Sequence, residues 1–224
     1  MVDTATARKL SKLPLAWVTP PQQVRTHATL GKLLDAAESL LDEKSWSDIS
    51  VAEIAAKADS SVGAFYRRFS DKDALLHSIH ERFVEEAMAT ADAALDADRW
   101  RGATLHDVVA DSLAFVMAVM RERHGLDRAV FERALSDDIF KERSNRLNSY
   151  VVQGMTALVN ARRDEITHAD PELAVNVALR QAFGFMTDTC TVGVTDYGLA
   201  DVDDETLTSE IARALTSYLG VRDE

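Results

Sequence analysis

The chain has 224 residues, of which 46% are hydrophobic, enough to form a substantial core without disulfide bonds. Its single cysteine, Cys190, excludes an intrachain disulfide and a cysteine-based zinc site, and is typical of a reducing compartment. The apolar run over residues 13–18 is too short, and too interrupted by proline, for a secretion signal or a membrane span. We therefore expect a soluble, cytoplasmic protein that does not contact a membrane.

The net charge of −12 is unevenly distributed along the chain. Residues 1–72 contain 10 lysines and arginines against 9 aspartates and glutamates, whereas residues 73–224 contain 15 against 28. Because an acidic surface repels a polyanion, any nucleic acid should contact the N-terminal third of the chain.

The pattern of apolar residues predicts an all-α fold. Three of the four prolines precede residue 22, and only nine glycines occur, so little interrupts long helices. Apolar residues recur at spacings of three and four, and no stretch beyond residue 25 shows the alternation typical of strands. We expect a flexible arm over 1–24, a helical module over 25–71 and a larger helical domain over 72–224.

Capping patterns divide the N-terminal module into short helices. A first amphipathic helix is expected from about residue 25 to 44, with Trp46 in the core beside it. Ser50 with Glu53 forms a capping box that should start a short helix at Val51. The run Asp59–Ser61 then supplies turn residues and a new N-cap.

A second short helix is expected directly after this turn. Val62, Phe65 and Phe69 should form its inward stripe, which leaves small residues and then long polar ones on the other faces. Ser70 with Asp73 repeats the capping pattern and predicts a long helix that begins at residue 71 or 72 and reaches about residue 95. Two short helices joined by a tight turn, with a supporting helix before them, form a helix-turn-helix.

The runs Ser50–Ala58 and Ser61–Phe69, followed by Lys72 and Leu75, resemble the DNA-binding signature of the tetracycline-repressor (TetR) family. The sequence departs from that signature at Asp59 and Ser60, where the family usually has glycine and a β-branched or apolar residue. Aspartate still tolerates a left-handed backbone, so we expect the turn to form.

The resemblance implies a role for each matching position. Val62, Gly63 and Ala64 would approach base edges, and phosphates would be held by Ser50, Tyr66, Arg68 and Lys72. We expect the following DNA-binding residues: Ser50, Ser61, Val62, Gly63, Ala64, Tyr66, Arg67, Arg68 and Lys72.

The remaining chain is expected to form further helices. Thr104 with Asp107 should start one that is apolar on two faces, and shorter and longer helices are expected over 129–135 and 138–162. Asp170 should cap a helix that reaches about residue 191, and the last helix, over 203–219, should end at Gly220.

The resemblance also implies that this larger half binds a small effector and forms a homodimer through its last two helices. A monomeric bundle is the alternative. Candidate effector-binding residues are Ser112, Phe115, Tyr150, Asn176, Arg180 and Phe183. Asn176 and Arg180 should face apolar surroundings, although Arg180 could instead pair with an acidic residue. Aromatic stripes at helical spacing also occur in ordinary cores.

No motif for catalysis is present, so we expect neither an enzyme nor a cofactor. His77, His80 and Glu81 share one helix face and could coordinate a metal, but such residues on the exposed side of a charged helix are more often solvated, and we predict no metal site. The sequence thus predicts a repressor that binds a near-palindromic double-stranded DNA operator as a homodimer and is released by a small molecule. A metal-responsive regulator and a helical module that binds protein rather than DNA are the alternatives.

Overall fold

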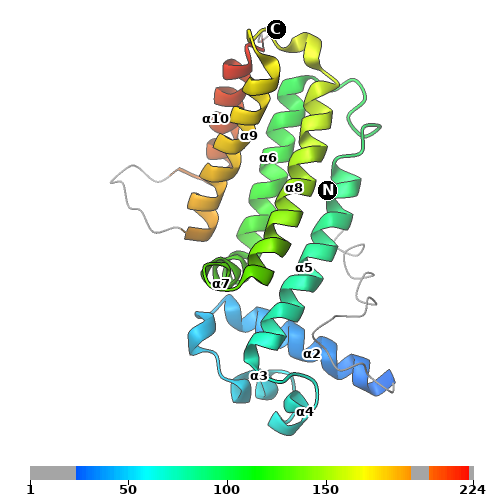
Figure 1. Cartoon of the computed structure of the whole chain (residues 1–224), viewed down its shortest axis with the longest axis vertical. Helices are drawn as coiled ribbons and strands as arrows, with labels where there is room; N and C mark the ends of the chain where they lie inside the picture. Colours follow the sequence, from blue (N-terminus) through cyan, green and yellow to red (C-terminus); the bar gives the residue numbers. More distant parts are fainter. Residues whose placement is uncertain (1–23, 193–201, 222–224) are drawn as a thin grey trace. The chain divides into compact units, whose positions relative to one another are not determined.

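Helices joined by short turns make up the computed structural model, which describes residues 24–192 and 202–221 (Figure 1). No strand occurs among these residues, and the predicted all-α fold is confirmed. None of the helices within the described ranges has the length and apolar character needed to cross a membrane. The arm expected over residues 1–24 lies outside the described residues, except for Val24, which begins the first helix.

The chain packs as two units. Unit 1 comprises the residues up to Thr90 together with Gly125–Leu147, and unit 2 comprises Ala91–His124 together with the residues from Asn148 onward. By packing, the greater part of the long helix that begins at Lys72 therefore belongs to unit 1. The division at residue 72 between DNA binding and effector binding concerns function, and it stays a prediction.

Unit 1 contains the short helices that the capping patterns predict. Its elements are α2 (Val24–Leu41), a 3-10 turn (Trp46–Asp48), α3 (Val51–Lys57), α4 (Val62–Tyr66), most of α5 (Lys72–Ala94), α7 (His124–Ala134) and the start of α8 (Asp138–Asn160). Helix α7 begins five residues earlier than expected at 129. Gly125 makes this possible, because a Cβ atom at this position would lie only 2.2 Å from the Leu41 carbonyl oxygen.

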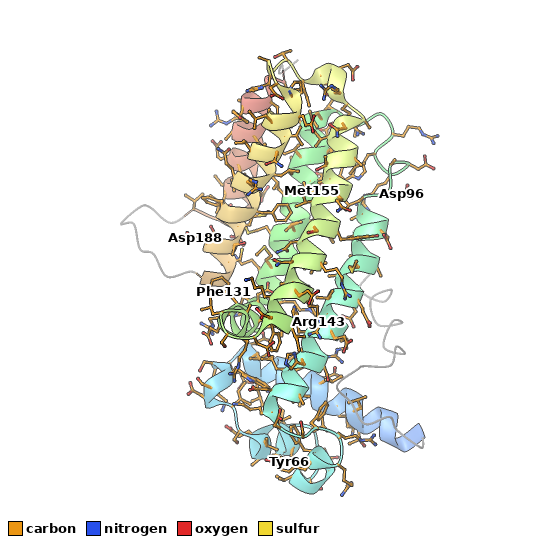
Figure 2. All side chains as sticks on the ribbon, viewed as in Figure 1. Tyr66, Asp96, Phe131, Arg143, Met155 and Asp188 are labelled. Carbon is orange, nitrogen blue, oxygen red and sulfur yellow. The ribbon has the colours of Figure 1, made fainter. Side chains whose placement is uncertain are left out.

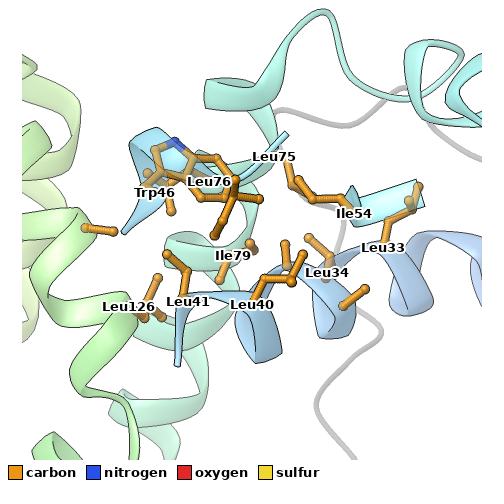
Figure 3. Packing of buried hydrophobic residues seen from close by; sticks show 14 of the residues in the cluster. Leu33, Leu34, Leu40, Leu41, Trp46, Ile54, Leu75, Leu76, Ile79 and Leu126 are labelled. Carbon is orange, nitrogen blue, oxygen red and sulfur yellow. The ribbon is translucent and has the colours of Figure 1, made fainter. Parts of the chain in front are cut away.

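The core of unit 1 lies between α2, α5 and α7 (Figure 3). The apolar stripe of α2 is buried as its spacing predicts, with Leu33 and Ala37 fully buried. Leu75, Leu76 and Ile79 of α5 are also fully inaccessible, and Trp46 and Leu126 close the same cluster. Ile54 of α3 and Phe65 of α4 belong to the same apolar cluster, so the two short helices are anchored on the three longer ones.

Unit 2 is a bundle whose helices lie side by side (Figure 1). Its elements are the end of α5, α6 (Leu105–Glu122), the rest of α8, a 3-10 turn (Arg163–Glu165), α9 (Pro171–Thr187), a π-helical turn (Asp188–Val192) and α10 (Asp204–Leu219). The capping box of Thr104 with Asp107 and the N-cap of Asp170 are confirmed. Gly220 ends α10 with a left-handed φ of 75°. Helix α9 ends at Thr187 rather than near residue 191, because its last turn widens into the π-helical turn.

Candidate nucleic-acid interface

A capping box fixes the start of α3. The Ser50 backbone N–H donates to Glu53 Oε2 at 2.8 Å, and the Glu53 N–H donates to Ser50 Oγ at 3.2 Å. Lys44 also binds this carboxylate. Hydrogen bonds from Lys44, and next from Ser50, lower the pKa of Glu53 to about 2. The carboxylate is therefore charged at neutral pH, and α3 begins where the sequence predicts.

The turn between α3 and α4 depends on a left-handed residue. Asp59 has a φ of 50°, so it adopts the backbone conformation for which the family usually has glycine. The Ser60 N–H donates to the Ala55 carbonyl at 2.8 Å and closes the end of α3. Ser61 Oγ then accepts a hydrogen bond from the Ala64 N–H at 3.1 Å and caps α4. The expected turn and cap are both present.

Two phenylalanines anchor the short helix α4. Phe65 and Phe69 are 0% and 1% exposed, with ring centroids 5.3 Å apart. Val62, expected as part of the same inward stripe, is instead 41% exposed. This expectation is wrong because α4 is only five residues long and begins at Val62, so the core ends at Phe65 and the valine lies beyond it.

Long polar side chains follow on the outer side of α4. Tyr66, which Figure 2 labels, is 56% exposed. Its ring packs edge-on against that of Phe65, with the ring centroids 5.3 Å apart. Arg67 is exposed, whereas Arg68 is half-buried. Partial burial, and next the charge of Arg67, lower the pKa of the Arg68 guanidinium. Because the half-buried Arg68 lies beside the charge of Arg67, an anion such as phosphate would be attracted to this position.

Three of the predicted phosphate-binding or base-facing residues already have structural roles. Ser50 and Ser61 cap helices, as described above. The Lys72 ammonium donates to the carbonyl oxygens of Trp46 at 2.6 Å and Ile49 at 2.8 Å, and lies 4.9 Å from the centre of the Trp46 ring. Burial lowers the pKa of Lys72. One of its three protons remains for a phosphate, so its DNA contact stays a prediction.

The cap of α5 differs from the predicted pair of Ser70 with Asp73. Asp71 Oδ1 accepts from the Ala74 N–H at 2.7 Å, and Ser70 Oγ donates to the other Asp71 oxygen at 2.9 Å. Because α5 begins at Lys72, the residue directly before it is the N-cap, and the serine lies one position too early.

Asp73 instead joins α5 to two other elements. Its Oδ1 accepts from Trp46 Nε1 at 3.1 Å and from Arg133 Nη2 of α7 at 2.8 Å. The sequence did not predict the role of Arg133, because Asp73 and Arg133 lie sixty positions apart and no local pattern relates them. The sequence pattern did single out Asp73, but it indicated a cap with Ser70.

The two histidines of α5 lie in the interior of unit 1, not on an exposed face as expected. His77 and His80 are 7% and 2% exposed, and both rings stack on Phe140, with centroids 4.0 and 5.4 Å away. They are buried because the start of α8 covers this face of α5.

Protein groups lie beside His77 Nε2 and both ring nitrogen atoms of His80. His77 Nε2 lies 3.2 Å from Asp137 Oδ2, and His80 Nδ1 lies 3.3 Å from Nη1 of Arg143, which Figure 2 labels on α8. Ser144 Oγ is 3.4 Å from His80 Nε2. Over the described ranges, no three histidine, cysteine, aspartate or glutamate side chains are grouped to hold a metal ion. The arrangement gives the metal-responsive alternative no support.

The six candidate effector residues do not converge on one site. Ser112 is buried in α6, Phe115 and Phe183 are half-buried, and the Tyr150 hydroxyl binds Asp92. The expected apolar surroundings of Asn176 and Arg180 are absent from the single chain. Both are exposed on a face of α9 that unit 2 leaves uncovered, and Arg180 Nε donates to Asn176 Oδ1 at 3.0 Å. Effector binding by these six residues stays a prediction.

A narrow cavity of about 20 Å³ lies elsewhere in unit 2. This is room for roughly one water molecule. Its lining is entirely apolar and comes from α6, α8, α9 and α10: Val109, Leu113, Met155, Val159, Val175, Ala178, Leu179, Leu215 and Leu219. None of the six predicted residues lines it.

Comparison with known proteins places both halves of the chain in one family. Residues 33–79 match the family described as bacterial regulatory proteins, tetR family. Residues 104–219 match the tetracyclin repressor-like C-terminal domain, and this match alone covers more than half of the 224 residues. The uncharacterized HTH-type transcriptional regulator YvdT of Bacillus subtilis (strain 168) is 30% identical over 102 residues, which are 45% of this chain and 49% of YvdT. The alignment thus spans about half the length of this curated relative.

Solved structures share the fold. The transcriptional regulator FadR from Bacillus subtilis, solved in complex with stearoyl-CoA, superposes with a TM-score of 0.62 at 20% identity, over 84% of this chain and 98% of FadR. A TetR transcription regulator from Haloarcula marismortui ATCC 43049 gives 0.62 at 19% identity, over 86% and 96% of the two chains. At these identities the likeness concerns the fold alone. Together with the two family matches, the capped α3–α4 pair shows that the chain belongs to the TetR family of helix-turn-helix transcriptional regulators.

Proposed function

We propose that this regulator represses transcription by binding a near-palindromic operator as a homodimer, and that a small-molecule effector releases it. The observation that carries the DNA contact is the outer side of α4. Phe65 and Phe69 hold the helix in place, while Val62, Tyr66 and Arg67 remain exposed. A helix with small residues first and cationic or hydroxyl groups next suits a major groove, because the backbone can approach the bases while longer side chains reach phosphates.

Exposed apolar side chains on the last two helices support the homodimer. Leu173 and Phe185 of α9 are 54% and 42% exposed, and Tyr218 of α10 is 37% exposed. A second copy of the chain would cover these side chains. It would also place two copies of α4 on one duplex, where half-sites lie about 34–36 Å apart. A single half-site reader would bind weakly at cellular salt.

The core of unit 2 favours an effector with an apolar part. The cavity lining carries no charge, and Met117, Met155 and Met186 lie in the same cluster. Methionine side chains adapt to new neighbours, so the helices can separate around a ligand at modest cost. The stearoyl-CoA bound by FadR is consistent with an effector of this kind. We propose that the apolar part enters between α6, α8, α9 and α10.

Release follows from linkage between the two ligands. An effector that displaces α5 changes the spacing of the two recognition helices, which then no longer match successive grooves. A coupling of about 1–3 kcal/mol would lower operator affinity roughly 5- to 150-fold. An effector that binds unit 2 and leaves operator affinity unchanged would contradict this mechanism.

Gly63 offers a direct test of the DNA contact. A Cβ atom at this position would meet only Arg67 Nη1 at 3.8 Å and Ser61 Oγ at 3.9 Å, which are ordinary contacts. Gly63→Ala should therefore fold normally, with stability unchanged or raised by roughly 0.5–1 kcal/mol. If α4 enters the groove, the added methyl group should weaken DNA binding. Genomic fragments are first selected with the wild-type protein. Fluorescence anisotropy then compares the affinity of Gly63→Ala and of the wild-type protein for these fragments.

A second helical glycine in unit 1 provides the control. Gly31 in α2 also has open space where a Cβ atom would lie, so Gly31→Ala should bind DNA like the wild-type protein. If Gly63→Ala bound DNA as tightly as Gly31→Ala, the proposed contact of α4 would be wrong. Salt provides an independent measure, because loss of the exposed Arg67 should reduce the slope of log affinity against log salt by about one.

A further inference from the structure

We infer that Val62 determines operator specificity by contacting the 5-methyl group of a thymine. The inference rests on the proposed function, because it needs α4 to lie in the major groove. It adds the chemistry of the contact: an apolar side chain that recognises the one base with a methyl group at its major-groove edge.

The first turn of α4 is poor in groups that could read a base by hydrogen bonds. Val62, Gly63 and Ala64 have no polar side-chain atom. Ser61 Oγ already accepts from the Ala64 N–H at 3.1 Å, which leaves its hydroxyl proton and one lone pair. A serine hydroxyl binds several bases and distinguishes them weakly. Discrimination at this part of the helix must therefore depend on shape and apolar contact.

Val62 is the side chain in this turn that can make such a contact. It is 41% exposed, whereas Ala64 is half-buried and Gly63 has no side chain. The fold gives no reason for a valine here, because Phe65 and Phe69 already fill the core beneath α4. An exposed valine on an otherwise small surface leaves two methyl groups for a partner. Thymine offers the matching group, since it alone among the four bases has a methyl group at its major-groove edge.

The longer side chains of α4 complement this contact. Tyr66 and Arg67 lie one turn later and are exposed. The residues at the start of a recognition helix generally contact base edges, while later ones reach the backbone. Val62 therefore reads sequence, and Tyr66 and Arg67 contribute affinity that is shared by all sequences.

Deoxyuridine in place of thymine tests the contact at the level of one methyl group. An operator fragment is first selected from genomic DNA with the wild-type protein. Each thymine of one half-site is then replaced singly by deoxyuridine, which pairs identically and lacks only the methyl group. We expect one position per half-site at which the dissociation constant rises about fourfold, and about fifteenfold when both half-sites carry the replacement.

Val62→Ala supplies the second arm of the experiment. Alanine is a better helix former and the replaced valine is exposed, so the variant should unfold at or above the wild-type temperature. At the sensitive position, the dissociation constants of the variant for thymine and deoxyuridine should differ by less than about twofold. The alanine side chain is shorter than that of valine, so the variant has already lost the contact with the thymine methyl group. Leu135→Ala, which removes another exposed apolar side chain of unit 1, should keep the full wild-type difference.

The outcomes separate this inference from the proposed function. If the protein binds its selected fragment but no deoxyuridine replacement weakens binding, the inference is overturned and the function stands. If Val62→Ala keeps the wild-type sensitivity to the methyl group, another residue reads it and the inference is again overturned. If no genomic fragment binds at low salt, the proposed function fails, and the inference fails with it.

Discussion

Unit 1 and unit 2 both have an apolar core, and they differ in the ionic contacts that lie near it. In unit 1, Arg82 of α5 binds Asp35 at 2.9 Å and Glu38 at 3.0 Å, both on α2. In unit 2, the centre is made of aliphatic and sulfur-containing side chains, and Cys190 Sγ lies 3.0 Å from Met117 Sδ. A hydrogen-bonded ion pair has one favourable geometry, whereas apolar packing tolerates rearrangement.

This difference fits the two proposed tasks. A helix that reads DNA must be held within a fraction of an ångström, so directional contacts around α2, α5 and α7 are useful in unit 1. A core that admits an effector must open, and adaptable side chains lower the cost of opening. Changes of backbone packing and of pH should therefore lower the free energy of unfolding strongly in unit 1. Comparable changes in unit 2 should lower it less.

The largest effect is expected where backbones meet. In Gly125→Ala, the new Cβ atom would lie 2.2 Å from the Leu41 carbonyl oxygen and 2.5 Å from its carbonyl carbon. Backbone atoms cannot rotate away, so α7 must move and unit 1 should lose about 3 kcal/mol or more of its free energy of unfolding. Urea unfolding followed by circular dichroism measures the loss.

Unit 2 contains the matched control. In Gly154→Ala, the Cβ atom would lie 2.5 Å from Leu95 Cδ1, the end of a flexible side chain that can change rotamer. We expect a loss of about 1 kcal/mol. Equal losses in the two variants would show that the two units do not differ in rigidity.

The next effect concerns pH and the buried His80. Burial, and next the charges of Arg143 and His77, lower the pKa of His80 to about 3. An unfolded histidine titrates near 6.5, so below that pH the unfolded chain binds a proton that the folded chain excludes. Above pH 6.5, His80 should therefore not lower the free energy of unfolding. Below pH 6.5, this free energy should fall by about 1.4 kcal/mol per pH unit, which amounts to roughly 2 kcal/mol by pH 5.

Urea unfolding at pH 7.5, 6.5, 5.75 and 5 tests this slope. His80→Gln should flatten it, whereas replacement of the exposed His124 by glutamine should leave it unchanged. Burial also lowers the pKa of His77, so this residue contributes a slope of the same sign. A wild-type slope in His80→Gln would mean that another group binds the proton.

The caps and the turn of the α3–α4 pair could be predicted from sequence because their partners are close in the chain. Ser50 binds Glu53 three residues later, and Asp59 determines its turn through its own backbone. The exposure of Val62 was not predictable from its spacing, because that required the end of α4 to be known. The burial of His77 and His80 was missed for a different reason: charged neighbours suggested solvent, while the covering Phe140 lies sixty positions later.

The effector site could not be predicted for the same physical reason. The cavity takes its lining from four helices, and its first and last lining residues, Val109 and Leu219, are far apart in the sequence. Helical periodicity shows which face of each helix is apolar, but it does not show which faces meet. Asn176 and Arg180 share an expected face with apolar residues, yet that face of the single chain is uncovered.

A smaller effect is expected at Lys72, and it distinguishes a structural role from a DNA contact. Lys72→Ala removes hydrogen bonds to the Trp46 and Ile49 carbonyl oxygens. We expect a loss of roughly 1–2 kcal/mol in the free energy of unfolding. Thermal unfolding measures this loss, and the salt dependence of DNA binding measures the contact. A lowered salt slope with unchanged stability would instead assign Lys72 to a phosphate.

The smallest effect compares one ion pair from each unit. Arg133 binds Asp73 at 2.8 Å in unit 1, and Arg121 binds Asp204 at 2.9 Å in unit 2, and all four side chains are between 40% and 48% exposed. Double-mutant cycles with alanine should give about 0.5–1 kcal/mol for each pair, because solvent screens both. Only the Asp73 pair should also change DNA affinity, since Asp73 holds Trp46 beside the start of α5. Equal effects of the two cycles on DNA affinity would show that the contact between α7 and α5 has no special part in placing α4.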